Sequence, residues 1–153
     1  MKLGPTIDGR IKIEIDHSGD FYLLAEMLQD AAGDEQTTHL ANHVGQHLDD
    51  DDWEEFVNPD LVVKFKQDIL TVSNILAAAQ DEQQKEFFIS SEDAAAWYST
   101  VNQARIFLEG KYELSELDEE YDPISGDPDL VEPFVKGRFY IQLQSLILEY
   151  LEF

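Results

Sequence analysis

Apolar residues recur at helical spacing in several separate stretches of this chain, and this pattern restricts the fold more than any other feature. The clearest stretch begins at Asn58-Pro59-Asp60, which combines a capping side chain, a proline suited to the first helical turn and a carboxylate. Its apolar positions then follow at Leu61, Phe65, Ile69, Val72, Leu76 and Ala79. The sequence therefore predicts a long amphipathic helix with one face in a core.

Three more stretches have the same periodicity. Their apolar positions are Phe21, Leu24, Leu28 and Ala31, then Trp97, Val101, Ala104 and Leu108, and finally Phe139, Leu143, Leu146 or Ile147, and Tyr150. Ser18 or Asp20 can cap the first helix, and Ser90 and Asp93 have capping-box spacing before the second. Gly33 and Gly110 are the expected stops of these two helices, and Pro133 starts or kinks the last. A weaker helical pattern at Leu40, Val44 and Leu48 is interrupted by a glycine.

Two short segments are typical of strands. Residues 10–16 alternate apolar and charged side chains, which is the period of a half-buried strand. Residues 86–89 are aromatic and β-branched and could pair with that strand. We therefore expect a mainly α fold for residues 1–153, a single-domain helical bundle of about four to five helices with a short N-terminal β-strand.

The chain is strongly acidic, and its charge narrows the possible partners. It carries 33 Asp and Glu against 10 Lys and Arg, a formal net charge of -23. Much of the excess lies in residues 49–55 and 113–132. Such a field repels nucleic acids and anionic membranes, whereas it attracts cationic partners and favours solubility. We expect a basic protein partner or self-association, with no nucleic acid and no membrane.

Other features point to a cytoplasmic protein without a recognisable catalytic motif. The sequence has no cysteine, no apolar run long enough for a membrane span and no signal peptide at its start. It also lacks a phosphate-binding loop, a dinucleotide fingerprint and a Gly-x-Ser-x-Gly nucleophile motif. We expect a cytoplasmic, non-enzymatic protein.

The third helical stretch resembles a family motif. Trp97, Asn102, Arg105, Leu108 and Gly110 occur in the order found in a mainly actinobacterial family of small helical proteins, a domain of unknown function. That motif has a tryptophan, then Leu-Asn, an arginine and a Leu-Gly ending. The match is loose around Glu109, and the chain departs from the motif at Val101 and at residues 111–112. The resemblance implies the helical fold and a bacterial cytosolic origin, and it implies no activity.

The same helix offers a candidate binding site. Tyr98, Asn102 and Arg105 recur at helical spacing beside the core stripe, so they should lie at the edge of the bundle. A guanidinium there could clamp a carboxylate or phosphate, or it could pair with one of the many acids of the chain itself. Trp53, flanked by carboxylates, could anchor a partner or be tucked into the core. We interpret these four residues as candidate contacts of an interaction or adaptor module with an acidic surface.

A metal site is the alternative function. His39, His43 and His47 recur every four residues, so neighbouring pairs on a helix could share zinc or a similar ion. All three cannot do so on one straight helix, because the outer two lie about 12 Å apart. No His-Glu-x-x-His signature is present, and a solvated polar face is the competing interpretation.

Overall fold

The computed structural model describes residues 1–33, 58–117 and 119–151. The described α-helices are α1 (Gly19–Ala32), α3 (Asn58–Asp81), α4 (Ala94–Tyr112) and α5 (Val131–Tyr150). The strands are β1 (Lys2–Pro5), β2 (Ile11–Glu14) and β3 (Glu86–Ile89), and two 3-10 turns, η2 (Leu114–Glu116) and η3 (Pro128–Leu130), precede α5. The expected mainly α fold with a short N-terminal strand is confirmed. The weak helical pattern at Leu40, Val44 and Leu48 lies outside the described residues.

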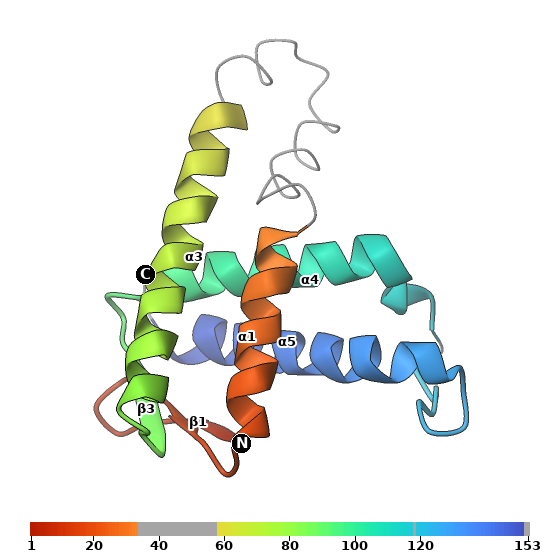
Figure 1. The fold of residues 1–153 in the computed structure, drawn as a ribbon, viewed down its shortest axis with the longest axis horizontal. Coiled ribbons are helices and arrows are strands. Elements are labelled where there is room, and N and C mark those ends of the chain that lie inside the picture. The colour runs from red at the N-terminus through yellow and green to blue at the C-terminus, as the bar shows by residue number, and fades with distance from the viewer. Residues whose placement is uncertain (34–57, 118, 152–153) are drawn as a thin grey trace.

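The helices form two crossed layers. Figure 1 shows α4 and α5 running antiparallel, with α1 and α3 lying across them. Helix α4 contacts α1, α3 and α5, and its predicted core stripe is confirmed. Its members Trp97, Val101, Ala104 and Leu108 are almost completely buried. The core is therefore built around α4, the helix that carries the candidate binding residues on its edge.

A small antiparallel sheet covers one end of this core. Its strand order is β1-β2-β3, and Ile13 of β2 lies opposite Phe87 of β3. Ile11 and Ile13 are fully buried, and the Phe87 ring stacks against Trp97 with 6.2 Å between the ring centroids. The expected pairing of the N-terminal strand with residues 86–89 is thus confirmed, whereas β1 was not predicted.

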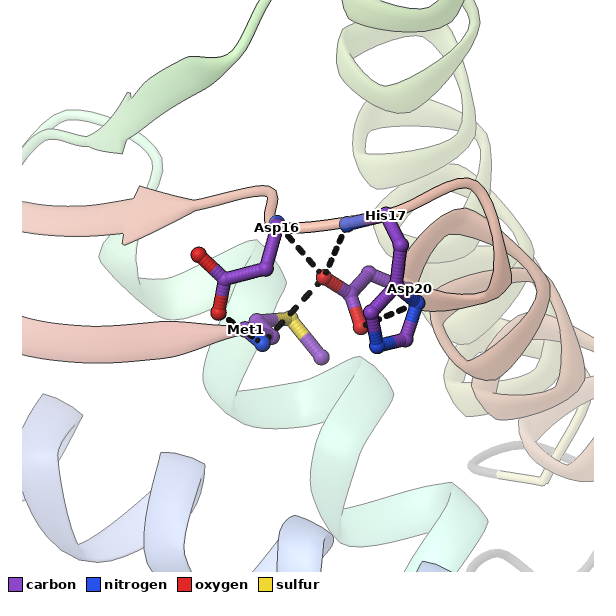
Figure 2. A network of polar contacts seen from close by, with 4 residues as sticks. All are labelled: Met1, Asp16, His17 and Asp20. Carbon is purple, nitrogen blue, oxygen red and sulfur yellow. Dashed lines mark hydrogen bonds and ion pairs between the residues drawn. The ribbon is translucent and has the colours of Figure 1, made fainter.

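A carboxylate fixes the connection between β2 and α1 (Figure 2). The Oδ2 atom of Asp20 accepts hydrogen bonds from the backbone N–H of Asp16 at 2.8 Å and of His17 at 3.3 Å. The Met1 ammonium lies 3.2 Å from this atom and 2.6 Å from Oδ2 of Asp16. Asp20 lies in the first turn of α1 and ties the preceding residues to the helix, whereas Ser18 occupies the N-cap position and makes no side-chain capping bond within the described residues.

These bonds also set the charge state of Asp20. Burial disfavours the carboxylate form, but the two backbone hydrogen bonds and the Met1 ammonium outweigh burial and hold the pKa of Asp20 below its ordinary value. At its other end α1 stops as expected, because Gly33 has a φ of 64° that an L side chain rarely adopts.

Two sequence expectations need correction. Helix α4 does not stop before Gly110 but continues to Tyr112, and it ends where Glu113 adopts a left-handed conformation with φ 53°. Tyr150, expected in the core stripe of the last helix, is 44% exposed, because α5 ends there and Leu151 turns inward instead. In the described part of the chain, none of the helices has both the length and the apolar character of a membrane span.

Candidate functional site

Two of the three predicted edge residues of α4, Asn102 and Arg105, lie on the side of the helix that meets α5. Tyr98 is half-buried and packs against the core. One turn further, Oδ1 of Asn102 accepts a hydrogen bond from Nε2 of Gln144 at 3.0 Å, which ties α4 to α5. Arg105, on the next turn, is exposed. The three side chains therefore follow one edge, as predicted, but Asn102 has a structural contact and only Arg105 borders a hollow.

That hollow is a groove between α4, α5 and the connection that follows α4, and we call it the α4–α5 groove. It has a volume of about 670 Å³, and its apolar lining includes Ile106, Leu114, Leu117, Phe134 and Ile141. Two arginines, Arg105 and Arg138, also line it. The guanidinium of Arg138 lies 4.9 Å from the centroid of the Phe134 ring, so a cation sits over the apolar wall.

A second hollow lies where α1 meets the end of α4 and the start of α5, and we call it the acidic cleft. Its volume is about 750 Å³. Its charged lining consists of four carboxylates and two ammonium groups, from Glu26, Asp30, Asp129, Glu132, Lys111 and Lys136. The half-buried Tyr112 and the exposed Pro128 add apolar surface. The cleft thus has an excess of negative charge beside an apolar floor.

Buried charges connect α1 to α5 at the base of this cleft. The Nζ atom of Lys136 lies 3.0 Å from Oδ2 of Asp30 and 3.4 Å from Oε2 of Glu26. The Tyr140 hydroxyl donates a hydrogen bond of 2.6 Å to the same Asp30 oxygen. Asp30 and Lys136 are both less than one-tenth exposed. Because a buried charge is costly without a partner, this arrangement holds the two helices in one relative position.

The pKa values of this cluster follow from its geometry. Burial alone would lower the pKa of Lys136, but hydrogen bonds and attraction from Asp30 and Glu26 outweigh it, so the pKa is raised. Burial, followed by the hydrogen bond to Asp30, raises the pKa of Tyr140. Lys136 therefore stays protonated and Tyr140 stays neutral at physiological pH, and neither group has the character of a general base.

Trp53 and the histidines His39, His43 and His47 lie outside the described residues, so their roles as a partner anchor and as zinc ligands stay predictions. Within residues 1–33, 58–117 and 119–151, no group of three or more His, Asp or Glu side chains has the arrangement of a metal site.

Comparison with known proteins gives a family but no activity. A family model described as a domain of unknown function, DUF2017, matches residues 16–141, which is most of the chain. The chain belongs to this family. Comparisons with curated proteins and with solved structures found no match. The expected relationship to a domain of unknown function is therefore confirmed for the DUF2017 region, which includes α1, α3, α4 and the first half of α5.

Sequence reasoning about this DUF2017 chain missed the residues that complete both hollows. Arg138 lies on α5, and its position at the same groove as Arg105 depends on how α4 and α5 align. The chain has only three arginines, so their scarcity was the available signal. Asp30 and Lys136 are separated by more than one hundred residues, and periodicity alone cannot show that two helices bring such charges together.

Proposed function

We propose that this protein is a non-enzymatic interaction module that receives a basic segment of a protein partner in the acidic cleft. The observation that carries this proposal is the unbalanced charge of the cleft, in which four carboxylates face two ammonium groups. Two of these carboxylates, Glu26 and Asp30, already form ion pairs with Lys136. Asp129 and Glu132 are exposed at the cleft and have no ion pair within the described residues, so they are available to a partner's lysine or arginine.

The shape of the cleft suits a long cationic side chain. A lysine or arginine buries its alkyl stem along apolar surface while its charged end remains near polar groups. The exposed Pro128 and the half-buried Tyr112 offer such surface next to the two carboxylates that have no ion pair among the described residues. The Lys111 ammonium lies over the rings of Phe107 and Tyr112, at 5.6 and 5.5 Å from their centroids. A cation of the partner can make the same kind of cation–π contact in the cleft.

Self-association is the other expected mode of interaction, and the net charge of the chain favours a basic partner over it. At a net charge of -23, two copies repel each other, whereas a basic segment is steered toward the surface. Association with a basic partner should then be fast at low salt and should weaken as salt screens the field.

A basic probe peptide tests the site. We would titrate a short synthetic peptide of lysine and alanine into the ¹⁵N-labelled protein and follow the amide shifts by NMR. The largest shifts are expected at residues 26–33, 107–112 and 128–136, and the double variant Asp129→Asn, Glu132→Gln should bind the peptide about tenfold more weakly at low salt.

A matched control separates the cleft from the acidic surface in general. The double variant Asp81→Asn, Glu92→Gln changes the net charge by the same amount at exposed positions away from the cleft. It should retain nearly full affinity. If both double variants weaken binding equally, or if the shifts spread evenly over the acidic surface, the peptide is held by net charge alone and the cleft is not the site.

We infer a bacterial, mainly actinobacterial distribution and a cytoplasmic location from the sequence, and we keep the tryptophan-to-glycine motif as the family signature. Zinc binding by His39, His43 and His47 is the alternative function, and it rests on their spacing alone.

A further inference from the structure

The α4–α5 groove differs in charge from the rest of the chain. Two of the three arginines of the sequence, Arg105 and Arg138, line it, although carboxylates outnumber basic residues more than threefold overall. Neither guanidinium forms an ion pair within the described residues, whereas the third arginine, Arg10, pairs with Asp8 at 2.7 Å. The groove therefore presents two available guanidinium groups on an apolar surface.

Among the described residues, the acidic side chains that line the groove form no ion pair with these guanidinium groups. Both carboxylate oxygens of Glu109 accept hydrogen bonds from Ser115, including one from its backbone N–H at 3.0 Å. That contact fastens the wall formed by residues 113–117 to α4. Glu119 also lines the groove and forms no ion pair with either arginine. The two cations can then hold an anion between α4 and α5.

The apolar part of the groove can hold a hydrocarbon body. Leu114, Leu117 and Phe134 form its walls, and Ile141 of α5 is 52% exposed beside Arg138. The groove volume of about 670 Å³ lies in the range of small-molecule sites. The Asn102–Gln144 hydrogen bond lies one turn beyond Arg105 and Ile141, and it joins the two helices at that end.

We propose that the α4–α5 groove binds a small amphiphile with one anionic head group, a carboxylic acid with an apolar chain. The head group would lie between Arg105 and Arg138, because guanidinium groups bind carboxylates through charge-assisted, paired hydrogen bonds. The chain would lie along Phe134, Leu114 and Ile141. This site is separate from the acidic cleft, and the proposal does not depend on the function proposed above.

The net charge of the protein decides between a small amphiphile and an acidic protein segment. A partner with many carboxylates would be repelled by a net charge of -23, and the same holds for a second copy of this chain. A ligand with a single negative charge is repelled far less by the net charge of the protein. Its attraction to two guanidinium groups in close contact then outweighs that repulsion.

Decanoate is a suitable probe, because it combines a carboxylate with a chain that fits an apolar groove. We would measure its affinity by NMR titration below its micelle concentration, with decanol as the uncharged comparison. Decanoate should shift amides of residues 105–117 and 134–141. Arg105→Gln and Arg138→Gln should each weaken decanoate binding at least about fivefold, and they should leave decanol binding unchanged.

Control variants make the result decisive. Lys66→Gln removes the same charge from an exposed position on α3 and should have no effect on decanoate. Ile141→Ser should weaken decanoate and decanol alike. The proposal is wrong if decanoate does not bind, if it binds without loss in both arginine variants, or if an acidic apolar peptide binds the groove and decanoate does not. Peptide binding to the acidic cleft would be unaffected by any of these outcomes.

Discussion

Replacing Asp20 with asparagine tests how the start of α1 is held. The substitution preserves the size of the side chain and removes its charge. In the native protein this carboxylate is 5% exposed, accepts two backbone hydrogen bonds and lies 3.2 Å from the Met1 ammonium. A hydrogen bond to a charged group contributes about 1.5–3 kcal/mol, and the asparagine oxygen can still accept one, so we expect a loss of about 2 kcal/mol.

For a domain of this size, such a loss lowers the melting temperature by roughly 4–8 °C. It can be measured at neutral pH by urea unfolding and by thermal unfolding followed with circular dichroism. Asp16→Asn is the matched control. Its side chain is 46% exposed and meets the same ammonium, but its carboxylate accepts no backbone N–H bond from the described residues, so the loss should stay below about 1 kcal/mol.

The pH dependence gives a second test with a defined sign. Because the pKa of Asp20 in the folded protein is lowered from 3.8, its carboxylate stabilises the fold fully above that pH. This stabilisation is lost as the pH falls through the lower pKa of the folded state. The stability difference between the native protein and Asp20→Asn should therefore shrink below pH 3.8. A difference that is the same at low and neutral pH, or equal losses for the two variants, would refute the explanation.

The remaining predictions concern the core, the acidic cleft, a loop and the histidines. Thr100→Val should raise the free energy of unfolding by about 1 kcal/mol in urea titrations, since the buried Thr100 hydroxyl has no hydrogen-bond partner among the described residues. Lys136→Met should lower it by about 3 kcal/mol or more, because two carboxylates then lose their shared cation at the base of the cleft. Gly126→Ala should lower the melting temperature, since a Cβ atom there would lie 2.6 Å from Cζ of Tyr121 and displace that ring from Phe134. If the histidine cluster binds zinc, one equivalent should raise the melting temperature and His43→Ala should abolish that rise; an unchanged melting temperature in the native protein contradicts it.

The fold was predictable wherever a long segment has a clear period. The start of α3 at Asn58 and the core face of α4 follow directly from capping residues and helical spacing. Strand β1 was not predictable, because the sequence Lys2–Pro5 contains a glycine and a proline and becomes a strand only by pairing with β2. Short edge strands depend on their neighbours more than on their own residues.

The candidate site was predictable in part. The edge position of Arg105 follows from its spacing relative to the α4 core stripe. Two other features depend on the antiparallel alignment of α4 and α5. These are the hydrogen bond between Asn102 and Gln144 and the position of Arg138 at the same groove as Arg105. A single sequence with helical periods shows which faces are buried but gives no alignment between helices. For the same reason, a single sequence does not predict contacts between charges that are distant in the chain, such as the ion pair of Asp30 with Lys136.

The central position of α4 has a consequence for synthesis on the ribosome. Helices α1 and α3 have α4 as their main neighbour, and they precede it in the chain. Leu24 and Val72, fully buried in the complete fold, have no α4 to cover them until residue 112 has left the exit tunnel. The nascent first half must therefore stay open to proteases and chaperones until α4 emerges, and folding should then proceed in one late step.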